Sequence, residues 1–203
     1  MTFQSKAEKE VIMSKLSLYT DGGCSHSGEG GWACVIVNEA TGAKLPLSGG
    51  KKETTNNVME LTALLEGLRN LVDHGVTSGV TVYSDSEYTK NTYTKWMHSW
   101  ARWGWRKSDG DKVSNLDLVK QLYEIYPKIT LDDYKWVKGH SGNPLNEYVD
   151  QLCQAEIKKQ KGEAVNVVPE DVLQQDPTYL KLNAMTKQDV IKYVIAHGFK
   201  VES

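Results

Sequence analysis

The feature that most constrains the fold is the segment 16–23, with the sequence LSLYTDGG. Its apolar residues alternate with polar ones, and this two-residue period is typical of a β-strand. The pattern ends on the carboxylate of Asp21, and the two glycines that follow allow the backbone to turn sharply. Ligands of open α/β sheets bind beyond the carboxyl ends of the strands. We therefore expect a strand that ends at Asp21 and presents this carboxylate at a candidate site, the alternative being an ordinary Asp-Gly turn.

The segments that follow predict a mixed sheet. Two apolar runs with short links, 31–38 and about 43–48, are typical of an antiparallel meander. Leucine and valine then recur at helical spacing over 57–73, which predicts an amphipathic helix. The strand predicted at 79–84 follows this helical crossover and is most simply parallel to an earlier strand. Asp85, directly after it, is therefore expected beside the carboxylate of the first strand, at the same edge of the sheet.

The rest of the chain completes an α/β domain and adds a tail. The further predicted elements are a helix and a broken helix over 86–105, a helix at 116–125, a strand at 131–137 and a last helix at 144–161. The last helix has a typical start, Asn143 followed by Pro144. The chain is thus divided into a leader (1–14), one domain (15–161) and an extension (162–203) with a helix at 190–197. We expect an α/β fold with a mixed five-stranded sheet flanked by helices, plus a small C-terminal helical extension.

Composition excludes several classes of protein. With 203 residues, 39% of them hydrophobic and 25% charged, the chain is typical of a soluble globular protein, and no apolar run approaches the ~18 residues of a membrane helix. Three cysteines favour reduced thiols in a cytoplasmic protein over a disulfide or zinc framework. The net charge of −2 does not indicate nucleic-acid binding, but residues 90–112 carry six Lys or Arg against two Asp. We expect a monomer with no membrane partner.

Three further carboxylates are potential partners of Asp21. Glu60 lies early in the first predicted helix, Asp85 follows the fourth strand, and Asp150 lies in the last core helix. Each alone has an ordinary interpretation, as part of a capping box, a helix cap and a solvated face respectively. Together they can face one edge of the sheet, where converging carboxylates repel unless a cation lies between them. Oxygen ligands without a Cys or His cluster indicate Mg²⁺ or Mn²⁺.

These carboxylates lie in motifs that closely resemble those of type 1 ribonuclease H. The motifs are YTDGGC at 19–24, TTNNVMEL at 54–61, YSDSEY at 83–88 and WVKGHSGNP at 136–144, followed by Asn146, Glu147 and Asp150. Their order and spacing match over residues 15–161. The resemblance implies a ribonuclease H-like fold and hydrolysis of the RNA strand of RNA–DNA hybrids. It also implies a catalytic set made of four metal-binding carboxylates and one mobile histidine: Asp21, Glu60, Asp85, Asp150 and His140.

The implied mechanism uses two divalent ions, Mg²⁺ in the working complex with Mn²⁺ as the alternative. Two ions about 3.5–4 Å apart would clamp the scissile phosphate, one activating a water and the other stabilising the leaving 3′ oxygen. The products would carry a 5′-phosphate and a 3′-hydroxyl. His140 would move protons or help product release, because imidazole titrates near neutral pH, and the alternative is a surface histidine in a loop.

Substrate contacts are expected in two places. Near the carboxylates, Gly22, Gly23, Asn56 and Glu60 are placed to read the 2′-hydroxyl that distinguishes RNA from DNA. The resemblance implies that Thr55 and Asn57 contact the DNA strand. The segment 90–112 resembles the family's basic protrusion, which grips the DNA strand, and its expected contacts are Trp96, Trp100, Arg102, Arg106 and Lys107. At least one of the tryptophans at 96, 100, 103 and 105 is expected to be a core residue.

Two other functions are weighed against this one. A nucleic-acid-binding module without activity is disfavoured, because the carboxylate set is complete. Another nuclease of the wider superfamily, such as a 3′→5′ exonuclease or a strand-transfer enzyme, is disfavoured by the loop around His140 together with the tryptophan-rich segment. The sequence therefore favours a hybrid-specific endoribonuclease.

Overall fold

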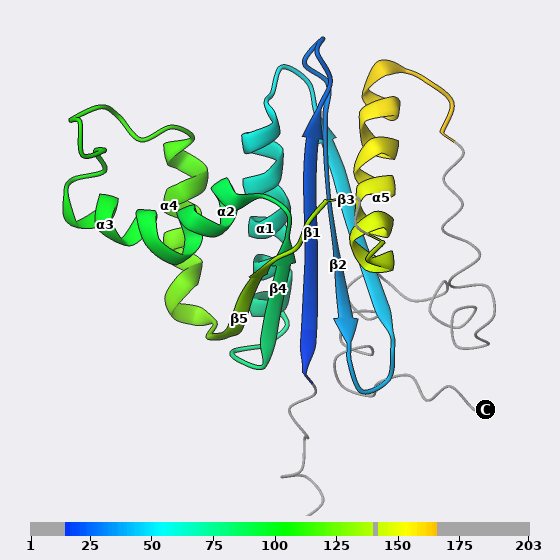
Figure 1. Ribbon diagram of the computed structural model, residues 1–203, viewed down its shortest axis with the longest axis horizontal. Coiled ribbons are helices and arrows are strands. Elements are labelled where there is room, and N and C mark those ends of the chain that lie inside the picture. Colours follow the sequence, from blue (N-terminus) through cyan, green and yellow to red (C-terminus); the bar gives the residue numbers. More distant parts are fainter. Residues whose placement is uncertain (1–14, 140–141, 166–203) are drawn as a thin grey trace, which may run out of the picture.

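A mixed sheet of five strands organises residues 15–139 and 142–165, the part of the chain that the computed structural model describes. The strands are β1 (Leu16–Cys24), β2 (Gly30–Asn38), β3 (Lys44–Lys51), β4 (Val80–Ser84) and β5 (Leu131–Trp136). They lie in the order β3-β2-β1-β4-β5, and the central β1 pairs antiparallel with β2 and parallel with β4 (Figure 1). The predicted mixed sheet and the predicted parallel pairing are confirmed.

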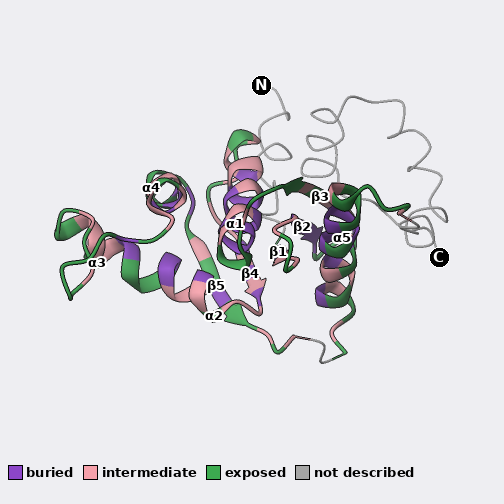
Figure 2. Ribbon diagram, turned by 90° about the horizontal axis from the view of Figure 1, so that it is seen from above, coloured by how far each residue is buried: buried purple, intermediate pink, exposed green. Residues whose placement is uncertain are grey.

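Helices cover both faces of this sheet. They are α1 (Asn56–Asp73), α2 (Glu87–Asn91), α3 (Met97–Arg102), α4 (Leu116–Ile125) and α5 (Pro144–Lys161). Helices α1 and α4 lie on one face and α5 lies on the other (Figure 2). Each face has its own core, because successive residues of β1 point to opposite sides. Leu18 packs with the leucines of α1, and Tyr19 packs with Val149 and Cys153 of α5.

The ends of α1 and α5 follow from their local sequences. The Thr55 side chain caps α1 by accepting a hydrogen bond from the Val58 amide. Asn143 caps α5 in the same way, Pro144 is its first residue, and Gly162 ends it with a left-handed φ of 76°. The start predicted for α5 is thereby confirmed.

One local prediction is wrong, because β1 does not end at Asp21. The strand continues for three more residues and remains paired with β2 throughout. Its two glycines lie where helices pack closely on the strand and not in a turn. A Cβ atom on Gly22 would lie 2.2 Å from the Glu60 amide nitrogen of α1, and one on Gly23 would lie 3.3 Å from Ile157 Cδ1 of α5. Asp21 therefore lies inside a paired strand with a helix packed closely on either side.

The segment between β4 and α4 projects from the sheet, at the left of Figure 1. Helix α2 passes through a π-helical turn (Thr92–Trp96) into α3, which confirms the predicted helix and broken helix. After α3 the chain forms a loop that is closed by a bridge between Arg106 and Lys112. Residues 92–112 are called the handle below.

The remaining boundaries differ little from those predicted. Strand β3 extends to Lys51, three residues beyond the expected end, because residues 49–51 continue to pair with β2. All three cysteines are free thiols, as predicted. The expected leader (1–14), His140 and the helix expected at 190–197 lie outside the described residues. Within the described ranges, no helix has both the length and the apolar character needed to cross a bilayer.

Candidate active site

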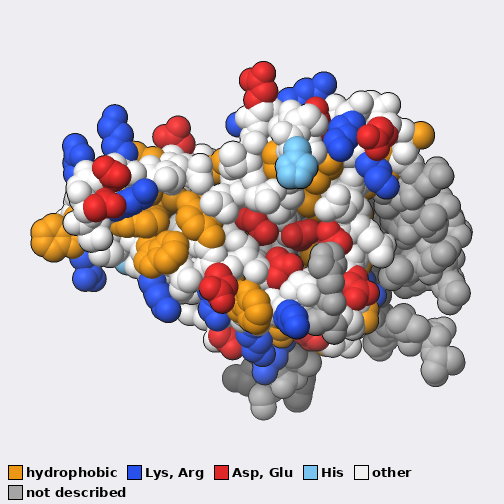
Figure 3. Space-filling view, turned by 45° about the horizontal axis from the view of Figure 1, so that its top comes forward, with side chains coloured by type: hydrophobic (Ala, Val, Ile, Leu, Met, Phe, Trp, Pro, Cys, Tyr) orange, Lys and Arg blue, Asp and Glu red, His pale blue; other side chains and the backbone are white. Residues whose placement is uncertain are grey.

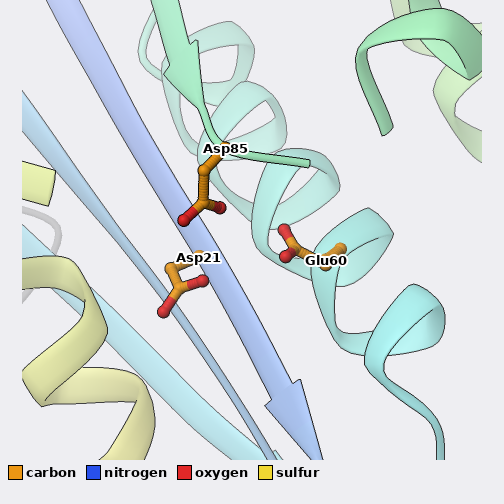
Figure 4. A group of neighbouring side chains, drawn as sticks. All are labelled: Asp21, Glu60 and Asp85. Carbon is orange, nitrogen blue, oxygen red and sulfur yellow. The ribbon is translucent and has the colours of Figure 1, made fainter. Parts of the chain in front are cut away.

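Three carboxylates from separate elements meet beside the end of β4 (Figure 4). Asp21 comes from β1, Glu60 from α1, and Asp85 from the residue after β4. One ligand oxygen of each carboxylate lies within 4.8 Å of those of the other two. The parallel pairing of β1 with β4 thus brings Asp21 and Asp85 together, and α1 adds Glu60. These three residues are called the carboxylate cluster below.

Glu60 reaches the carboxylate cluster because α1 lies directly against β1 at Gly22. Its alternative interpretation, as the last residue of a capping box that begins at Asn57, is wrong, since the cap of α1 is Thr55. The Glu60 side chain points toward the other two carboxylates instead (Figure 4). The residue is only 9% exposed, and its Oε2 has no hydrogen-bond partner among the described residues. A buried oxygen of this kind is costly unless a proton or a cation binds to it.

Burial and mutual repulsion raise the pKa values of the carboxylate cluster. The pKa of Asp21 is raised from 3.8 to about 7, first by burial and then by the charges of Asp85 and Asp150. Burial, followed by the charges of Asp21 and Asp85, raises the pKa of Glu60 well above its ordinary value. Hydrogen bonds with the Gly22 backbone lower both pKa values in part. Without a cation the cluster therefore retains protons, which a bound cation would replace.

Asp150 approaches the carboxylate cluster without joining it. It lies half-buried in α5, and its charge raises the pKa of Asp21. Its Oδ1 accepts a hydrogen bond from Gln154 Nε2 at 3.3 Å, and it is not among the three residues whose oxygens lie within 4.8 Å of one another. His140, the other predicted catalytic residue, lies outside the described residues. The structure thus brings three of the predicted catalytic side chains together and places Asp150 nearby.

Two residues to which the sequence assigned no role, Trp136 and Gly139, contact Asp85. The Trp136 indole donates from Nε1 to the Asp85 carbonyl oxygen at 2.8 Å. A Cβ atom on Gly139 would lie 2.7 Å from Asp85 Oδ2, so the backbone passes close beside this carboxylate. Both residues belong to the motif at 136–144, which was the signal available in the sequence. Their contact with Asp85 depends on the pairing of β4 with β5, and no local pattern shows that pairing.

The predicted substrate residues near the carboxylate cluster differ in accessibility. Thr55, Asn56 and Asn57 are exposed at the start of α1. Gly22 is buried and Gly23 is half-buried, each packed against a helix. The start of α1 therefore offers side chains to a ligand, whereas the two glycines offer only backbone groups.

The tryptophans of the handle fall into two groups. Trp100 and Trp105 pack against the core on the α1 face of the sheet, which confirms that some of these residues belong to the core. Trp96 and Trp103 are 38% and 74% exposed. These two rings therefore offer more surface to a ligand than Trp100 and Trp105 do.

The basic side chains of the handle that are predicted to contact the DNA strand also differ in exposure. Arg102 and Arg106 are exposed and Lys107 is half-buried. The Arg106 guanidinium donates to the Gly110 carbonyl oxygen at 2.9 Å, so this side chain also supports the loop of the handle. Figure 3 shows acidic side chains gathered at the centre of one face, with hydrophobic and basic side chains toward the end where the handle lies.

Relatives of known sequence identify the family. The family model described as RNase H matches residues 13–158. The chain is 40% identical over 152 residues to the ribonuclease H of Hahella chejuensis, a match that covers 74% of this chain and 99% of that protein. It is 44% identical over 140 residues to the ribonuclease H of Gluconobacter oxydans, covering 68% of this chain and 89% of that one.

Solved structures show the same fold. LC9-RNase H1, described as a type 1 RNase H with the type 2 active-site motif, matches with a TM-score of 0.63 and 24% identity, over 87% of this chain and 84% of that one. RNase H1 from the halophilic archaeon Halobacterium salinarum matches with a TM-score of 0.53 and 19% identity, over 71% and 98% of the two chains. With a family model that spans most of its length and close relatives that it covers almost end to end, this chain belongs to the ribonuclease H family of nucleases.

Proposed function

We propose that this protein is an endoribonuclease that hydrolyses the RNA strand of RNA–DNA hybrids. The observation that carries the proposal is the carboxylate cluster of Asp21, Glu60 and Asp85 in a chain of the ribonuclease H family. The foamy viral protease–reverse transcriptase, described in complex with an RNA/DNA hybrid, shares the fold over 73% of this chain, with a TM-score of 0.58. The same viral protein is also described in complex with double-stranded DNA, so both duplexes are tested below.

The residues present fit divalent cations that prefer oxygen ligands. Asp21, Glu60 and Asp85 would hold the ions, and the unpaired Oε2 of Glu60 is a ligand atom with no other described partner. A donor set of carboxylates favours Mg²⁺, with Mn²⁺ as the alternative, and we propose two ions in the working complex. When bound, these ions supply Lewis acidity, which neutralises charge on the scissile phosphate and lowers the pKa of the attacking water.

The protein's own contribution is to hold these oxygen ligands in place and to move protons. Asp21 lies within a paired strand and Glu60 within a helix packed against it, so little reorganisation is needed when substrate binds. We propose that Asp150 completes the ligand set from α5. His140 is proposed to carry protons to or from the reacting groups, because imidazole titrates near neutral pH. Hydrolysis leaves a 5′-phosphate on one fragment and a 3′-hydroxyl on the other.

The hybrid is proposed to lie across the face shown in Figure 3, from the central acidic side chains to the handle. The RNA strand would lie over the carboxylate cluster, where Asn56, Glu60 and the backbone of Gly22 and Gly23 read the 2′-hydroxyl. The DNA strand would contact the exposed start of α1 and the handle. Its proposed contacts are Thr55, Asn57, Trp96, Trp100, Arg102, Arg106 and Lys107. Phosphate contacts of this kind position a duplex without reading its sequence.

The direct test is a cleavage assay on three duplexes of one sequence. Each is labelled at the 5′ end of one strand: an RNA–DNA hybrid, a double-stranded RNA and a double-stranded DNA. We expect internal cuts in the RNA strand of the hybrid alone, only when Mg²⁺ is present, and lost with a chelator. Ligation of the recovered fragments would confirm the 5′-phosphate and 3′-hydroxyl ends. Release of single nucleotides from one end would favour an exonuclease, and binding without cleavage would favour an inactive module.

We also propose that residues 15–161 form the complete catalytic domain and act as a monomer. The motifs and both cores lie within this range. A chain truncated after Glu163, which retains the Gly162 cap of α5, is expected to elute as a folded monomer with Mg²⁺-dependent nuclease activity. Loss of cooperative unfolding in the truncated chain would show that the extension is part of the domain.

A further inference from the structure

We propose that Trp136 is a positioning residue: its indole N–H holds the main chain of Asp85 and so sets the affinity of the carboxylate cluster for divalent metal. This inference rests on the proposed function, because it concerns the metal that the cluster would bind. The observation behind it is the hydrogen bond from Trp136 Nε1 to the Asp85 carbonyl oxygen, at 2.8 Å.

Of the three clustered carboxylates, only Asp85 has a main chain that belongs to neither a strand nor a helix. Asp21 lies within β1 and Glu60 lies within α1, so the main chain of each belongs to a hydrogen-bonded element. Asp85 follows the last residue of β4 and precedes Ser86, the N-cap of α2. Its peptide therefore lies in the two-residue gap between the end of β4 and the start of α2.

The end of β5 extends the sheet across this gap. Ser84, the last residue of β4, is paired with Trp136, the last residue of β5. The Val137 amide then donates to the Ser84 carbonyl oxygen at 3.0 Å. The next carbonyl along the chain, that of Asp85, receives its hydrogen bond from a side chain, the Trp136 indole. The indole thus continues the hydrogen bonding between the two strands by one residue, up to the metal-binding position.

Burial does not account for a tryptophan at this place. Trp136 is 44% exposed and lies on the edge strand of the sheet, so its ring contributes less to the core than a buried ring would. The specific contribution of the side chain is its single N–H donor. A Cβ atom on Gly139 would lie 2.7 Å from Asp85 Oδ2, so the backbone there passes close to this carboxylate. Asp85 is therefore held at its carbonyl by the indole, while its carboxylate has the backbone at Gly139 close beside it.

Loss of the indole donor should weaken metal binding more than it lowers the maximal rate. Asp21 and Glu60 keep their places, and the charge of Asp85 is unchanged. At saturating metal, Asp85 can therefore still bind as the third carboxylate ligand. Substitutions of groups that orient metal ligands weaken metal binding, and one hydrogen bond to a neutral carbonyl is among the weaker of such contacts. We expect the Mg²⁺ concentration at half-effect to rise about 3- to 10-fold.

The test compares Trp136→Phe, which keeps a ring but no donor, with Trp136→His, whose Nε2 occupies the same place in the five-membered ring as indole Nε1. The first measurement needs no nucleic acid: the rise in melting temperature is recorded as Mg²⁺ is added to the full chain. The second is the Mg²⁺ dependence of hybrid cleavage. We expect the midpoint of both curves to rise in Trp136→Phe, to return part of the way in Trp136→His, and the KM for hybrid to stay within about twofold.

Controls separate this proposal from its alternatives. Tyr126→Phe removes a polar hydrogen from another exposed ring, in the turn after α4, and should leave the Mg²⁺ midpoint unchanged. A merely structural role for Trp136 would lower the melting temperature without metal and leave the Mg²⁺ midpoint as in wild type, which would overturn the proposal. If Mg²⁺ stabilises the wild type and Asp85→Asn abolishes that effect while Trp136→Phe does not change it, only this inference fails. If Mg²⁺ does not stabilise the wild type at all, the proposed function fails with it.

Discussion

The carboxylate cluster and the handle are built in different ways. Around the carboxylate cluster the backbone determines the positions, because β1 touches α1 at Gly22 with no room for a side chain. In the handle, Tyr93 and Met97 anchor the inner end in the core, whereas residues 98–112 are exposed or half-buried. Trp103 is 74% exposed there, and the Arg106 guanidinium donates to a carbonyl oxygen of its own loop. One region is a rigid arrangement of a few charged oxygens, and the other is a surface of separate side chains.

This difference determines how each region should respond to substitution. A rigid cluster depends on every member, so single changes there should have effects that are close to all-or-none. A surface of separate cations acts through the sum of its charges, so changes there should be graded and sensitive to salt. Substitutions in the two regions can therefore test whether the contrast is real.

The largest effect is expected from neutralising a carboxylate of the cluster. Asp21→Asn or Asp85→Asn should abolish cleavage of the hybrid, because each removes a charged metal ligand. Affinity for the hybrid should stay within about tenfold, since the handle and backbone contacts remain. Single-turnover cleavage and equilibrium binding at ordinary Mg²⁺ measure the two quantities. Glu124→Gln, on an exposed residue of α4, is the matched control, and turnover by either Asn variant would contradict the assignment.

Adding a methyl group to a glycine should destabilise the protein more beside the carboxylate cluster than in the handle. Gly22→Ala would place a Cβ 2.2 Å from the Glu60 amide nitrogen, so α1 must move away from β1. We expect a loss of about 3 kcal/mol in the free energy of unfolding, together with a higher Mg²⁺ requirement, since Glu60 moves with the helix. Gly110→Ala in the handle meets open space, and its φ of 89° implies only about 1 kcal/mol of backbone strain. Equal losses in urea denaturation would remove the contrast between the two regions.

Neutralising the handle should produce a graded change. The variant that carries Arg102→Gln, Arg106→Gln and Lys107→Gln should weaken hybrid binding and reduce the slope of log affinity against log salt by about 2 to 3. The physical reason is that fewer counterions are released from the duplex. The control neutralises three exposed lysines outside the handle: Lys15, Lys128 and Lys158. An unchanged slope in the handle variant, or an equal change in the control, would show that the handle does not grip the DNA strand.

The smallest effect concerns stability without metal. The pKa of Asp21 is raised from 3.8 to about 7 in the folded protein, so its protonated form favours folding. This stability is complete below pH 3.8 and is lost as pH rises through 7. Asp21→Asn avoids the loss. In chelator it should therefore be more stable than wild type by ~0.5–2 kcal/mol at neutral pH and no more stable near pH 4.

Melting curves in chelator and in Mg²⁺ test this prediction. Mg²⁺ should stabilise the wild type by mass action and the variant less, because the variant has lost a ligand. A variant that melts at or below the wild type in chelator at neutral pH would show that the carboxylates of the cluster do not repel one another.

The sequence predicted those parts of the site that depend on long motifs and on simple sheet geometry. The parallel pairing of β1 with β4 follows from a strand after a helical crossover, and it places Asp85 beside Asp21. The end of β1 could not be predicted in the same way. Two glycines after Asp21 are as typical of a turn as of a strand on which two helices pack, and only the positions of α1 and α5 decide between these.

Other parts of the site depend on contacts between distant segments. The interpretation of Glu60 as a capping residue is excluded by the place where α1 begins, one residue from the expected start. The contact of Trp136 with Asp85 joins residues that are 51 apart in sequence. No sequence pattern predicts the hydrogen-bond partner of an exposed tryptophan at a strand end. Asp150 lies near the cluster with its Oδ1 bonded to Gln154, and periodicity does not predict which side-chain conformation such a residue adopts.

The position of β1 has a consequence for how the molecule opens. This strand is paired on both sides and covered on both faces, so its backbone amides should be among the last to exchange with solvent. The outer part of the handle, residues 98–112, is exposed or half-buried, so it should open locally at a lower cost than β1. Opening of the handle leaves β1 in contact with α1, so Asp21 stays beside Glu60. Under the proposed function, one duplex could then leave and another bind while Asp21 and Glu60 remain together.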